Sequence, residues 1–297
     1  MKILLTGASG NVGSHTLPQL VRRGHDVRTF DLRHGDITDA AAVAQAVAGV
    51  DVVIHLAAVI PPLADEQPAL ARAVNVGGTA NVIAACQASP SRPRLLFIST
   101  LDVHGITVGN EPPRRVGDRM VATNPYTEHK IECEELIRSS GLDWAIFRLA
   151  DVPVLGLRPA HPIMFEIGLH NRIECVHADD VGLAIANALE TPQAWGRVLF
   201  IGGGASCQLT YGEYLTRLLA AMGVQPLPDK AFSPADYCTD WLDTTDSQAL
   251  LQYQRHSFDD IARAIAASLG WRRALLPLVR PLVRRSMLRL SPYYSHA

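Results

Sequence analysis

The chain has 297 residues, of which 48% are hydrophobic and 19% charged, and its formal net charge is -2. This composition is typical of a globular protein of about two domains, and it excludes extended disorder and a general attraction to nucleic acid. Five scattered cysteines without a CxxC pair disfavour a disulfide framework, and histidines without an HExxH motif or comparable cluster predict no metal site. The opening MKILLT is too short for a signal-peptide core, and we expect a cytoplasmic protein without a membrane-spanning helix.

Short runs rich in Val, Ile and Leu alternate with Ala-rich stretches along the first two thirds of the chain. The predicted strands cover residues 3–6, 27–30, 52–56, 95–99, 144–149 and 198–201. The predicted helices cover residues 12–23, 40–48, 69–88, 126–140 and 179–189. Strands that are continuously hydrophobic and bounded by helices indicate a parallel sheet covered on both faces. The sequence therefore predicts an α/β fold with a doubly wound parallel sheet of the Rossmann type.

The regular alternation weakens from about Val152, where Pro, His and Gly become more frequent. We expect the chain to leave the sheet there for a smaller substrate lobe and to return to it once. The predicted division is a dinucleotide-binding domain of residues 1–151 and 177–203, a substrate lobe of residues 152–176 and 204–270, and a basic tail of residues 271–297. The two lobes are therefore interleaved in sequence.

The segment TGASGNVG, residues 6–13, follows the first predicted strand and opens the first predicted helix. Glycines at positions 7, 10 and 13 suit a tight turn, the close approach of a pyrophosphate and tight helix packing. Asp31 ends the second strand 18 residues after Gly13, where a carboxylate would bind the adenosine ribose and repel a 2′-phosphate. NAD is therefore favoured over NADP, although Arg28 and Arg33 keep NADP as an alternative.

The segment PYTEHK, residues 125–130, places Tyr126 four residues before Lys130, directly after Asn124 and Pro125. Asn and Pro are favoured at a helix start, and the fourfold spacing puts both side chains on one helix face. One interpretation is an ordinary amphipathic helix. The other is a phenol whose pKa is lowered by an adjacent ammonium, so that it exchanges a proton near neutral pH.

Several landmarks in order decide between these interpretations: TGASGNVG, Asp31, GDITD at 35–39, HLAA at 55–58, NVGGT at 75–79, STLDVHG at 99–105, YTEHK and HADDVG at 177–182. With these landmarks the chain resembles the extended short-chain dehydrogenases/reductases of the NAD-dependent epimerase/dehydratase family, of which UDP-galactose 4-epimerase is a familiar member. The resemblance covers residues 1 to about 268. One departure is that only three residues separate Asp31 from Gly35, so the third strand of the family is expected to be truncated or missing.

The resemblance implies a cofactor site and a catalytic site at matching positions. The implied cofactor contacts are Gly7, Gly10, Asn11, Val12, Gly13, Asp31, Asp36, Ile37, Leu56, Ala57, Ala58, Tyr126 and Lys130. Tyr126 would be the proton donor or acceptor, and Lys130 would bind the nicotinamide ribose and lower the phenol pKa. Counting back from Gly105 assigns the hydroxyl that holds the substrate oxygen to Thr100, with Ser99 as its neighbour.

Other positions near this site differ from the family pattern. The related dehydratases carry an Asp and Glu pair where this chain has Leu101 and Asp102, so dehydration by their route is disfavoured. Asp102 is either a second acid/base or a carboxylate that holds a loop or cap, and His104 is expected to pack. Asp151 and Arg119 are candidates for substrate binding, and solvation is the alternative for Arg119 as for Arg114 and Arg115. Asp179 is expected to cap and anchor a helix.

The favoured hypothesis is an NAD-dependent epimerase, or dehydratase-like enzyme, acting on a secondary alcohol or ketone of a sugar or sugar nucleotide. The alternative is a dehydrogenase or carbonyl reductase of a smaller substrate, and a third hypothesis is a dinucleotide sensor without turnover. A homodimer through the helices at 69–88 and 126–140 is expected by analogy with the family. The tail after Trp271 has six arginines and no acid, and we expect it to dock on the acidic body or a neighbouring subunit, with a weak membrane contact as the alternative.

Overall fold

The computed structural model describes residues 1–156, 159–271 and 276–294, and within them it leaves the side chains of 276–279 undescribed. Six parallel strands form one sheet. In sheet order they are β2 (Asp26–Phe30), β1 (Lys2–Thr6), β3 (Val52–His55), β4 (Arg94–Thr100), β5 (Trp144–Leu149) and β7 (Arg197–Ile201). All six predicted strands are confirmed. Strands β1, β3, β4, β5 and β7 are largely buried between the two helix layers, whereas in the edge strand β2 only Phe30 is buried.

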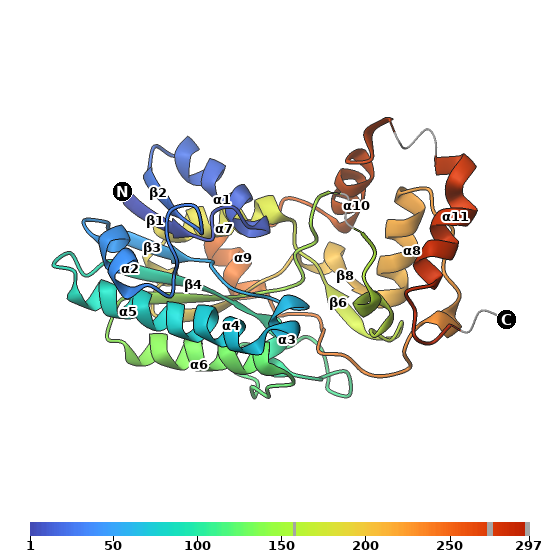
Figure 1. Ribbon diagram of the computed structural model, residues 1–297, viewed down its shortest axis with the longest axis horizontal. Coiled ribbons are helices and arrows are strands. Elements are labelled where there is room, and N and C mark those ends of the chain that lie inside the picture. Colours follow the sequence, from blue (N-terminus) through green and yellow to red (C-terminus); the bar gives the residue numbers. More distant parts are fainter. Residues whose placement is uncertain (157–158, 272–275, 295–297) are drawn as a thin grey trace.

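Helices cover both faces of the sheet (Figure 1). On one face lie α1 (Asn11–Arg22), α7 (Ala178–Leu189) and α9 (Thr245–Leu251), and on the other α2 (Ala40–Val47), α5 (Gly78–Ala88) and α6 (Pro125–Ser139). Each layer closes over its own buried cluster, with Leu5 and Ile185 in one and Leu4 and Ile83 in the other. The doubly wound Rossmann architecture is thereby confirmed.

Two of the connections between strands of the sheet are not simple strand–helix–strand units. The predicted helix at 69–88 consists of α4 (Pro68–Arg72), a π-helical segment η1 (Ala73–Gly77) and α5, preceded by α3 (Leu63–Glu66). Between β2 and α2, residues 31–39 contain only turns, so β2 is an edge strand and the missing strand is confirmed for this part of the chain.

The second lobe contains a two-stranded antiparallel sheet and three helices (Figure 1). These elements are β6 (Arg172–Glu174), β8 (Gln208–Thr210), α8 (Tyr211–Ala221), α10 (Phe258–Ala267) and α11 (Leu276–Leu288). Short 3-10 turns occur at Leu101–His104, Pro162–Phe165, Pro192–Ala194, Ala205–Cys207 and Asp229–Ala231. The lobe has its own hydrophobic core, around Phe165, Leu215 and Phe258, and its segments alternate in sequence with those of the sheet.

The tail packs on this lobe. Leu288 is buried in the lobe core, and Val283, Met287 and Leu290 pack against it, as expected for docking on the body. Helix α11 nevertheless contains Pro281, although proline disfavours helix interiors. Pro281 is exposed and is the sixth of the thirteen residues of α11, where its missing N–H removes one helix hydrogen bond. Among the described helices, none is both long and apolar enough to cross a bilayer.

Candidate active site

The candidate site residues gather at the carboxyl edge of the parallel sheet. Gly7 follows β1, Asp31 follows β2, Leu56 follows β3, Thr100 ends β4 and Asp151 lies just beyond β5. In the sheet, β1 lies between β2 and β3. The connection that follows β1 leads to one side of it, and the connection from β2 to β3 leads to the other, so the strand order changes direction here. Such a change of direction is where open α/β sheets bind their ligands.

The glycine turn has the shape that a pyrophosphate requires. Gly7 has φ of +68°, and an added Cβ would lie 2.8 Å from the backbone nitrogen of Ala57. A Cβ on Gly13 would lie 2.3 Å from the carbonyl oxygen of Gly7, so only glycine allows α1 to start this close to β1. The N-cap residue of α1 is Gly10, which offers no side-chain acceptor, and the first amides of the helix remain available to phosphate oxygens. Asn11 donates a side-chain hydrogen bond to the Val152 carbonyl and ties α1 to the start of the second lobe.

Asp31 is held in place by its neighbours. Burial opposes its charge, but the backbone N–H of Arg33, the Ser9 hydroxyl and His34 bring its pKa below the ordinary range. A carboxylate here suits ribose hydroxyls and repels a 2′-phosphate. Arg28, one of the arginines that kept NADP open, donates to the Ala46 carbonyl at the end of α2 (2.7 Å).

The adenine-side residues differ in exposure. Asp36 is exposed and accepts a hydrogen bond from the Thr38 backbone N–H (2.9 Å). Ile37 is buried, its side chain lies against Gly78 and its carbonyl accepts from Asn81. Asp36 is thus exposed on this turn, and Ile37 is buried beneath it.

A buried hydrogen-bonded chain, absent from the sequence prediction, holds the end of β3. The Thr79 hydroxyl donates to the Asn75 carbonyl (2.6 Å), so it accepts from Nε2–H of His55 (3.1 Å). Burial lowers the pKa of His55 to about 3, so the ring is neutral and its Nδ1 accepts from the Thr6 hydroxyl (2.8 Å). Thr6 in turn accepts the N–H of Leu56 and of Ala57.

The side chain of Asn75 completes this support. Its Oδ1 accepts the Val59 N–H (2.7 Å) and its Nδ2 donates to the Val59 carbonyl (2.9 Å). The motifs HLAA and NVGGT therefore fix the backbone of residues 56–59, which follow β3 at the carboxyl edge of the sheet. The sequence signal that could have indicated this hydrogen-bonded support is the pair Asn75 and Thr79, four residues apart, together with His55 at the end of a predicted strand.

Helix α6 begins as the sequence predicts. Asn124 and Thr127 form a reciprocal capping box, and Pro125 occupies the first turn. Tyr126 and Lys130 are both buried, with Tyr126 against Ala64 and Ala71. The Lys130 Nζ donates to the Ile98 carbonyl (2.8 Å) and lies 5.8 Å from the centroid of the Tyr126 ring.

The pKa values in this arrangement differ from the expectation. Burial, followed by the charges of Asp102 and Cys133, raises the pKa of Tyr126 above its ordinary value. Burial lowers the pKa of Lys130 to about 8. The prediction that the ammonium makes the phenol more acidic is therefore wrong for the chain by itself, because desolvation outweighs the cation at this distance.

The two hydroxyls at the end of β4 have different surroundings. Ser99 is buried beside Glu134, whereas Thr100 is partly exposed. The Thr100 hydroxyl accepts the N–H of Asp102 (3.2 Å), so Thr100 caps the turn and Asp102 does not. Burial and the nearby charge of Asp151 raise the pKa of Asp102 to about 7, against a hydrogen bond from Thr100 that lowers it.

The second lobe contributes side chains to the same space. Tyr237 and Cys238 lie close enough to Asp102 for its charge to raise the pKa of each, after burial. Thr123, which directly precedes the cap of α6, donates or accepts a hydrogen bond at the Cys238 thiol. Asp151 joins the lobes, since its N–H donates to the Glu174 carbonyl (3.0 Å) and its carbonyl accepts from Val176 (2.8 Å). Sequence reasoning missed Tyr237 and Cys238, because no motif surrounds them.

Two comparisons of sequence match this geometry to known proteins. The model of the NAD dependent epimerase/dehydratase family matches residues 3–163. A 2-alkyl-3-oxoalkanoate reductase from Stenotrophomonas maltophilia is 31% identical over 270 residues, which cover 78% of this chain and 79% of that protein. The chain belongs to the NAD-dependent epimerase/dehydratase family. Membership makes it an enzyme of the oxidoreductase type with NAD as cofactor, and the glycine turn and Asp31 fit that cofactor.

Two further comparisons are informative. A 3 beta-hydroxysteroid dehydrogenase/Delta 5-->4-isomerase from Mycobacterium tuberculosis is 32% identical over 165 residues, covering 48% of this chain and 44% of that protein. The crystal structure of UDP-glucuronic acid 4-epimerase from Bacillus cereus in complex with NAD superimposes with a TM-score of 0.73 at 23% identity. That alignment covers 92% of this chain and all of the other, and it shows the shared fold.

The loop before α6 is fastened by a buried ion pair. Arg148 donates to both carboxylate oxygens of Glu134 (2.9 and 2.7 Å), to the Val116 carbonyl (3.0 Å) and to Nε2 of His104 (2.9 Å). Burial opposes the charge of Glu134, but Arg148 holds its pKa below the ordinary range. His104 donates to the Arg119 carbonyl, so it packs and orders the loop as expected, while Arg119 is exposed.

The other two arginines of this loop behave differently. Arg114 is buried, and its Nε lies 3.1 Å from the Asp240 carboxylate, which Arg172 also contacts (2.5 Å). The expectation that Arg114 is solvated is therefore wrong. Arg115 is exposed, and its backbone N–H donates to Asp118 (2.9 Å).

At the start of α7 the expected capping role of Asp179 is wrong, whereas its contact with His15 joins α7 to α1, as expected of an anchor. His177 is the N-cap, and its ring accepts the Asp179 N–H (3.1 Å), while the Asp179 carboxylate accepts from His15 on α1 (2.7 Å). Asp180 is the buried anchor, because it accepts from the N–H of Arg255 and from the ring and N–H of His256.

This start of α7 also gathers metal-ligand residue types that the sequence did not group. Potential ligand atoms of His177, Asp179 and His256 lie within 4.8 Å of one another. The two imidazole rings are stacked, with centroids 4.0 Å apart and planes at 16°. Lone pairs in nearly parallel planes do not converge on one ion, so the cluster is suited to joining the lobes.

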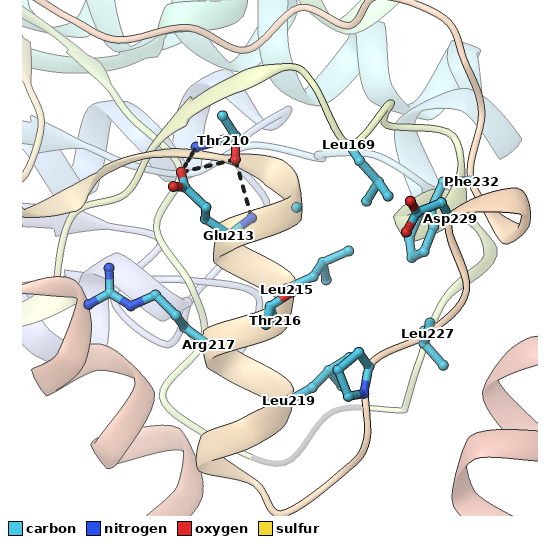
Figure 2. Close-up of a pocket in the computed structure, with 12 residues that line it drawn as sticks. Leu169, Thr210, Glu213, Leu215, Thr216, Arg217, Leu219, Leu227, Asp229 and Phe232 are labelled. Atoms are coloured by element: carbon cyan, nitrogen blue, oxygen red, sulfur yellow. Dashed lines mark hydrogen bonds between the residues drawn. The ribbon is translucent and has the colours of Figure 1, made fainter.

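A hollow of about 440 Å³ lies in the second lobe, away from the catalytic edge (Figure 2). Leu215 and Leu219 of α8 face Leu227 and Phe232 across it, and Leu169 borders it. The capping box of Thr210 and Glu213 forms its upper rim. None of the predicted catalytic residues lines this hollow.

Proposed function

We propose that the protein is an NAD-dependent dehydrogenase or carbonyl reductase acting on a secondary alcohol or ketone of a substrate without a diphosphate group. The observation that carries this choice is the acidic surroundings of Tyr237, a residue of the second lobe. Burial raises the pKa of Tyr237, and further contributions come from Cys238, Asp102, Glu166 and Asp65. Three carboxylates within electrostatic range of one phenol disfavour a doubly charged diphosphate.

The arginines at the lobe boundary strengthen this argument. A sugar nucleotide is held by cations, most effectively by guanidinium groups that reach two phosphate oxygens. Arg114 and Arg172 are both committed to Asp240, whose side chain is 1% exposed. A diphosphate would have to break a buried ion pair to recruit either of them.

The residues of the chain itself account for the proton chemistry. NAD, when bound, supplies the hydride acceptor or donor. The raised pKa of Tyr126 keeps its phenol protonated at neutral pH, which suits proton donation to a ketone oxygen. The Thr100 hydroxyl accepts the Asp102 N–H and donates to the Asp102 carboxylate, so its proton can turn to the same substrate oxygen when Asp102 is itself protonated.

Lys130 and Asp102 support this proton transfer. The Ile98 carbonyl holds the Lys130 ammonium beside the Tyr126 ring, where it stabilises a phenolate formed during the reaction. A carboxyl with a pKa of about 7 exchanges protons near neutral pH, and Asp102 is therefore suited to returning a proton to the site.

Epimerisation of a sugar nucleotide, the hypothesis favoured from sequence, is the second candidate. The shared fold with the Bacillus cereus epimerase supports it, while the acidic surroundings of Tyr237 weigh against it. The non-catalytic sensor is disfavoured because Tyr126 and Lys130 are both buried side by side, an arrangement that binding alone does not need.

Cofactor turnover separates the candidates. We would incubate the protein with NAD and secondary alcohols, including 3-hydroxyacids and hydroxysteroids, and with NADH and the matching ketones, while following absorbance of NADH. Net NADH formation or consumption supports the proposal. Interconversion of UDP-sugars, detected by NMR with no net change in NADH, would instead establish the epimerase.

A further inference from the structure

We propose that the outer face of α11 binds an anionic lipid surface. The residues after Trp271 include six arginines and no acid, although the whole chain has a net charge of -2. The first 271 residues therefore carry a net charge of -8. This proposal is independent of the proposed catalytic function, because α11 lies on the side of the second lobe away from the sheet (Figure 1).

Helix α11 has two different faces. Val283, Met287 and Leu288 face the lobe core and fix the helix to the body. Arg285 and Arg289 are exposed on the outer face, and Arg280 is exposed at the edge of the helix, near Gly223 of the lobe. The inner face thus accounts for docking, and the charge on the outer face requires a separate explanation.

The arginines border a hollow large enough for a phosphate-bearing headgroup. Its volume is about 550 Å³, and Arg280, Arg284 and Arg285 line it together with Gln225 and Tyr294. Lys230 lies nearby, with its Nζ 4.9 Å from the centroid of the Tyr294 ring. Residues 280 and 284 are one helical turn apart, so their guanidinium groups project in the same direction, toward the edge where α11 meets residues 223–226 of the lobe. Arg284 also donates to the Pro226 carbonyl (3.3 Å), which holds it at the edge of the hollow.

Exposed apolar side chains accompany this charge. Leu282 is 67% exposed, Trp271 is 74% exposed and Tyr293 is 44% exposed. Arginines mixed with exposed Trp, Tyr and Leu are typical of segments that lie in a membrane interface. An acidic protein surface would satisfy the arginines but would leave these apolar groups in water, and the pattern therefore favours lipid over a second copy of the chain.

The test is co-sedimentation of the full-length protein with vesicles of phosphatidylcholine alone or mixed with phosphatidylglycerol. We expect binding only to the anionic vesicles, weakened by salt. Each arginine contributes roughly a fivefold gain in affinity, so changing Arg280, Arg284 and Arg285 together to Gln should weaken binding roughly 100-fold. Leu282→Asp should also weaken it, while the matched triple change of the exposed Arg22, Arg197 and Arg263 to Gln should have a much smaller effect.

Thermal unfolding of each variant identifies any that fail to fold, and Leu282→Asp, at an exposed position, then provides the second test. Equal binding to neutral vesicles, or equal losses in the two triple variants, would overturn the proposal. Displacement by millimolar inorganic phosphate would identify a small-anion pocket instead. Concentration-dependent association that the α11 triple variant abolishes, without vesicle binding, would identify a second copy as the occupant.

Discussion

Removing the buried guanidinium of Arg148 is a demanding test of how α6 is held in place. Arg148 is 1% exposed and makes two hydrogen bonds to Glu134, which is fully buried. In Arg148→Met, Glu134 keeps only Arg138 as a cationic partner (2.7 Å), and the Val116 carbonyl loses its donor. Breaking a buried ion pair from one side costs about 3–5 kcal/mol, because a desolvated charge is left uncompensated.

We therefore expect the free energy of unfolding to fall by about 3–5 kcal/mol, and the Tm by about 6–20 °C at the usual sensitivity of larger domains. Urea unfolding followed by circular dichroism measures the first and calorimetry the second. The double variant Glu134→Leu with Arg148→Met removes both charges, and it should recover at least half of the loss. A loss of under about 1 kcal/mol in Arg148→Met, or a double variant less stable than the single one, would refute the reasoning.

Three further predictions concern the cofactor turn and the proton chemistry. Asp102→Asn removes a charge that raises the pKa of Tyr126, so the pH profile of kcat/KM for alcohol oxidation should move to lower pH; an unchanged or upward-shifted profile would contradict this. Gly13→Ala places a methyl carbon 2.3 Å from the Gly7 carbonyl oxygen, and it should weaken NAD binding in calorimetry about 5- to 150-fold, whereas Gly77→Ala, which meets nothing within 4 Å, should bind normally. Asn75→Ala leaves both backbone groups of Val59 without their side-chain partner, and urea unfolding should show a loss of about 1–3 kcal/mol; no loss would mean that water replaces the amide.

The strands and the helix caps could be predicted from sequence because their signals are local. A buried parallel strand such as Val52–His55 is a continuous apolar run, and Asn124 with Pro125 marks a helix start without reference to the rest of the fold. The glycine turn was equally local, since an added Cβ at Gly7 or Gly13 meets only nearby backbone.

The remaining contacts depend on residues that are far apart in the chain. Asp240 pairs with Arg114 across 126 positions, and no motif around either residue indicates the other. The pKa of Tyr126 depends on burial in the folded protein, so the neighbouring Lys130 alone suggested the opposite direction. Asp179 was expected to be the cap because Asp is a favoured N-cap, but His177 starts the helix two residues earlier.

The central claim is that Tyr126 carries the proton chemistry of a site that binds NAD independently of it. The most direct measurement compares wild type and Tyr126→Phe in two assays, NAD binding by isothermal calorimetry and NADH production with the alcohol found in the substrate screen. The account predicts NAD affinity within about threefold of wild type and a fall in kcat of at least about 100-fold, as expected for loss of a general acid/base. Turnover in Tyr126→Phe close to the wild-type rate would contradict it.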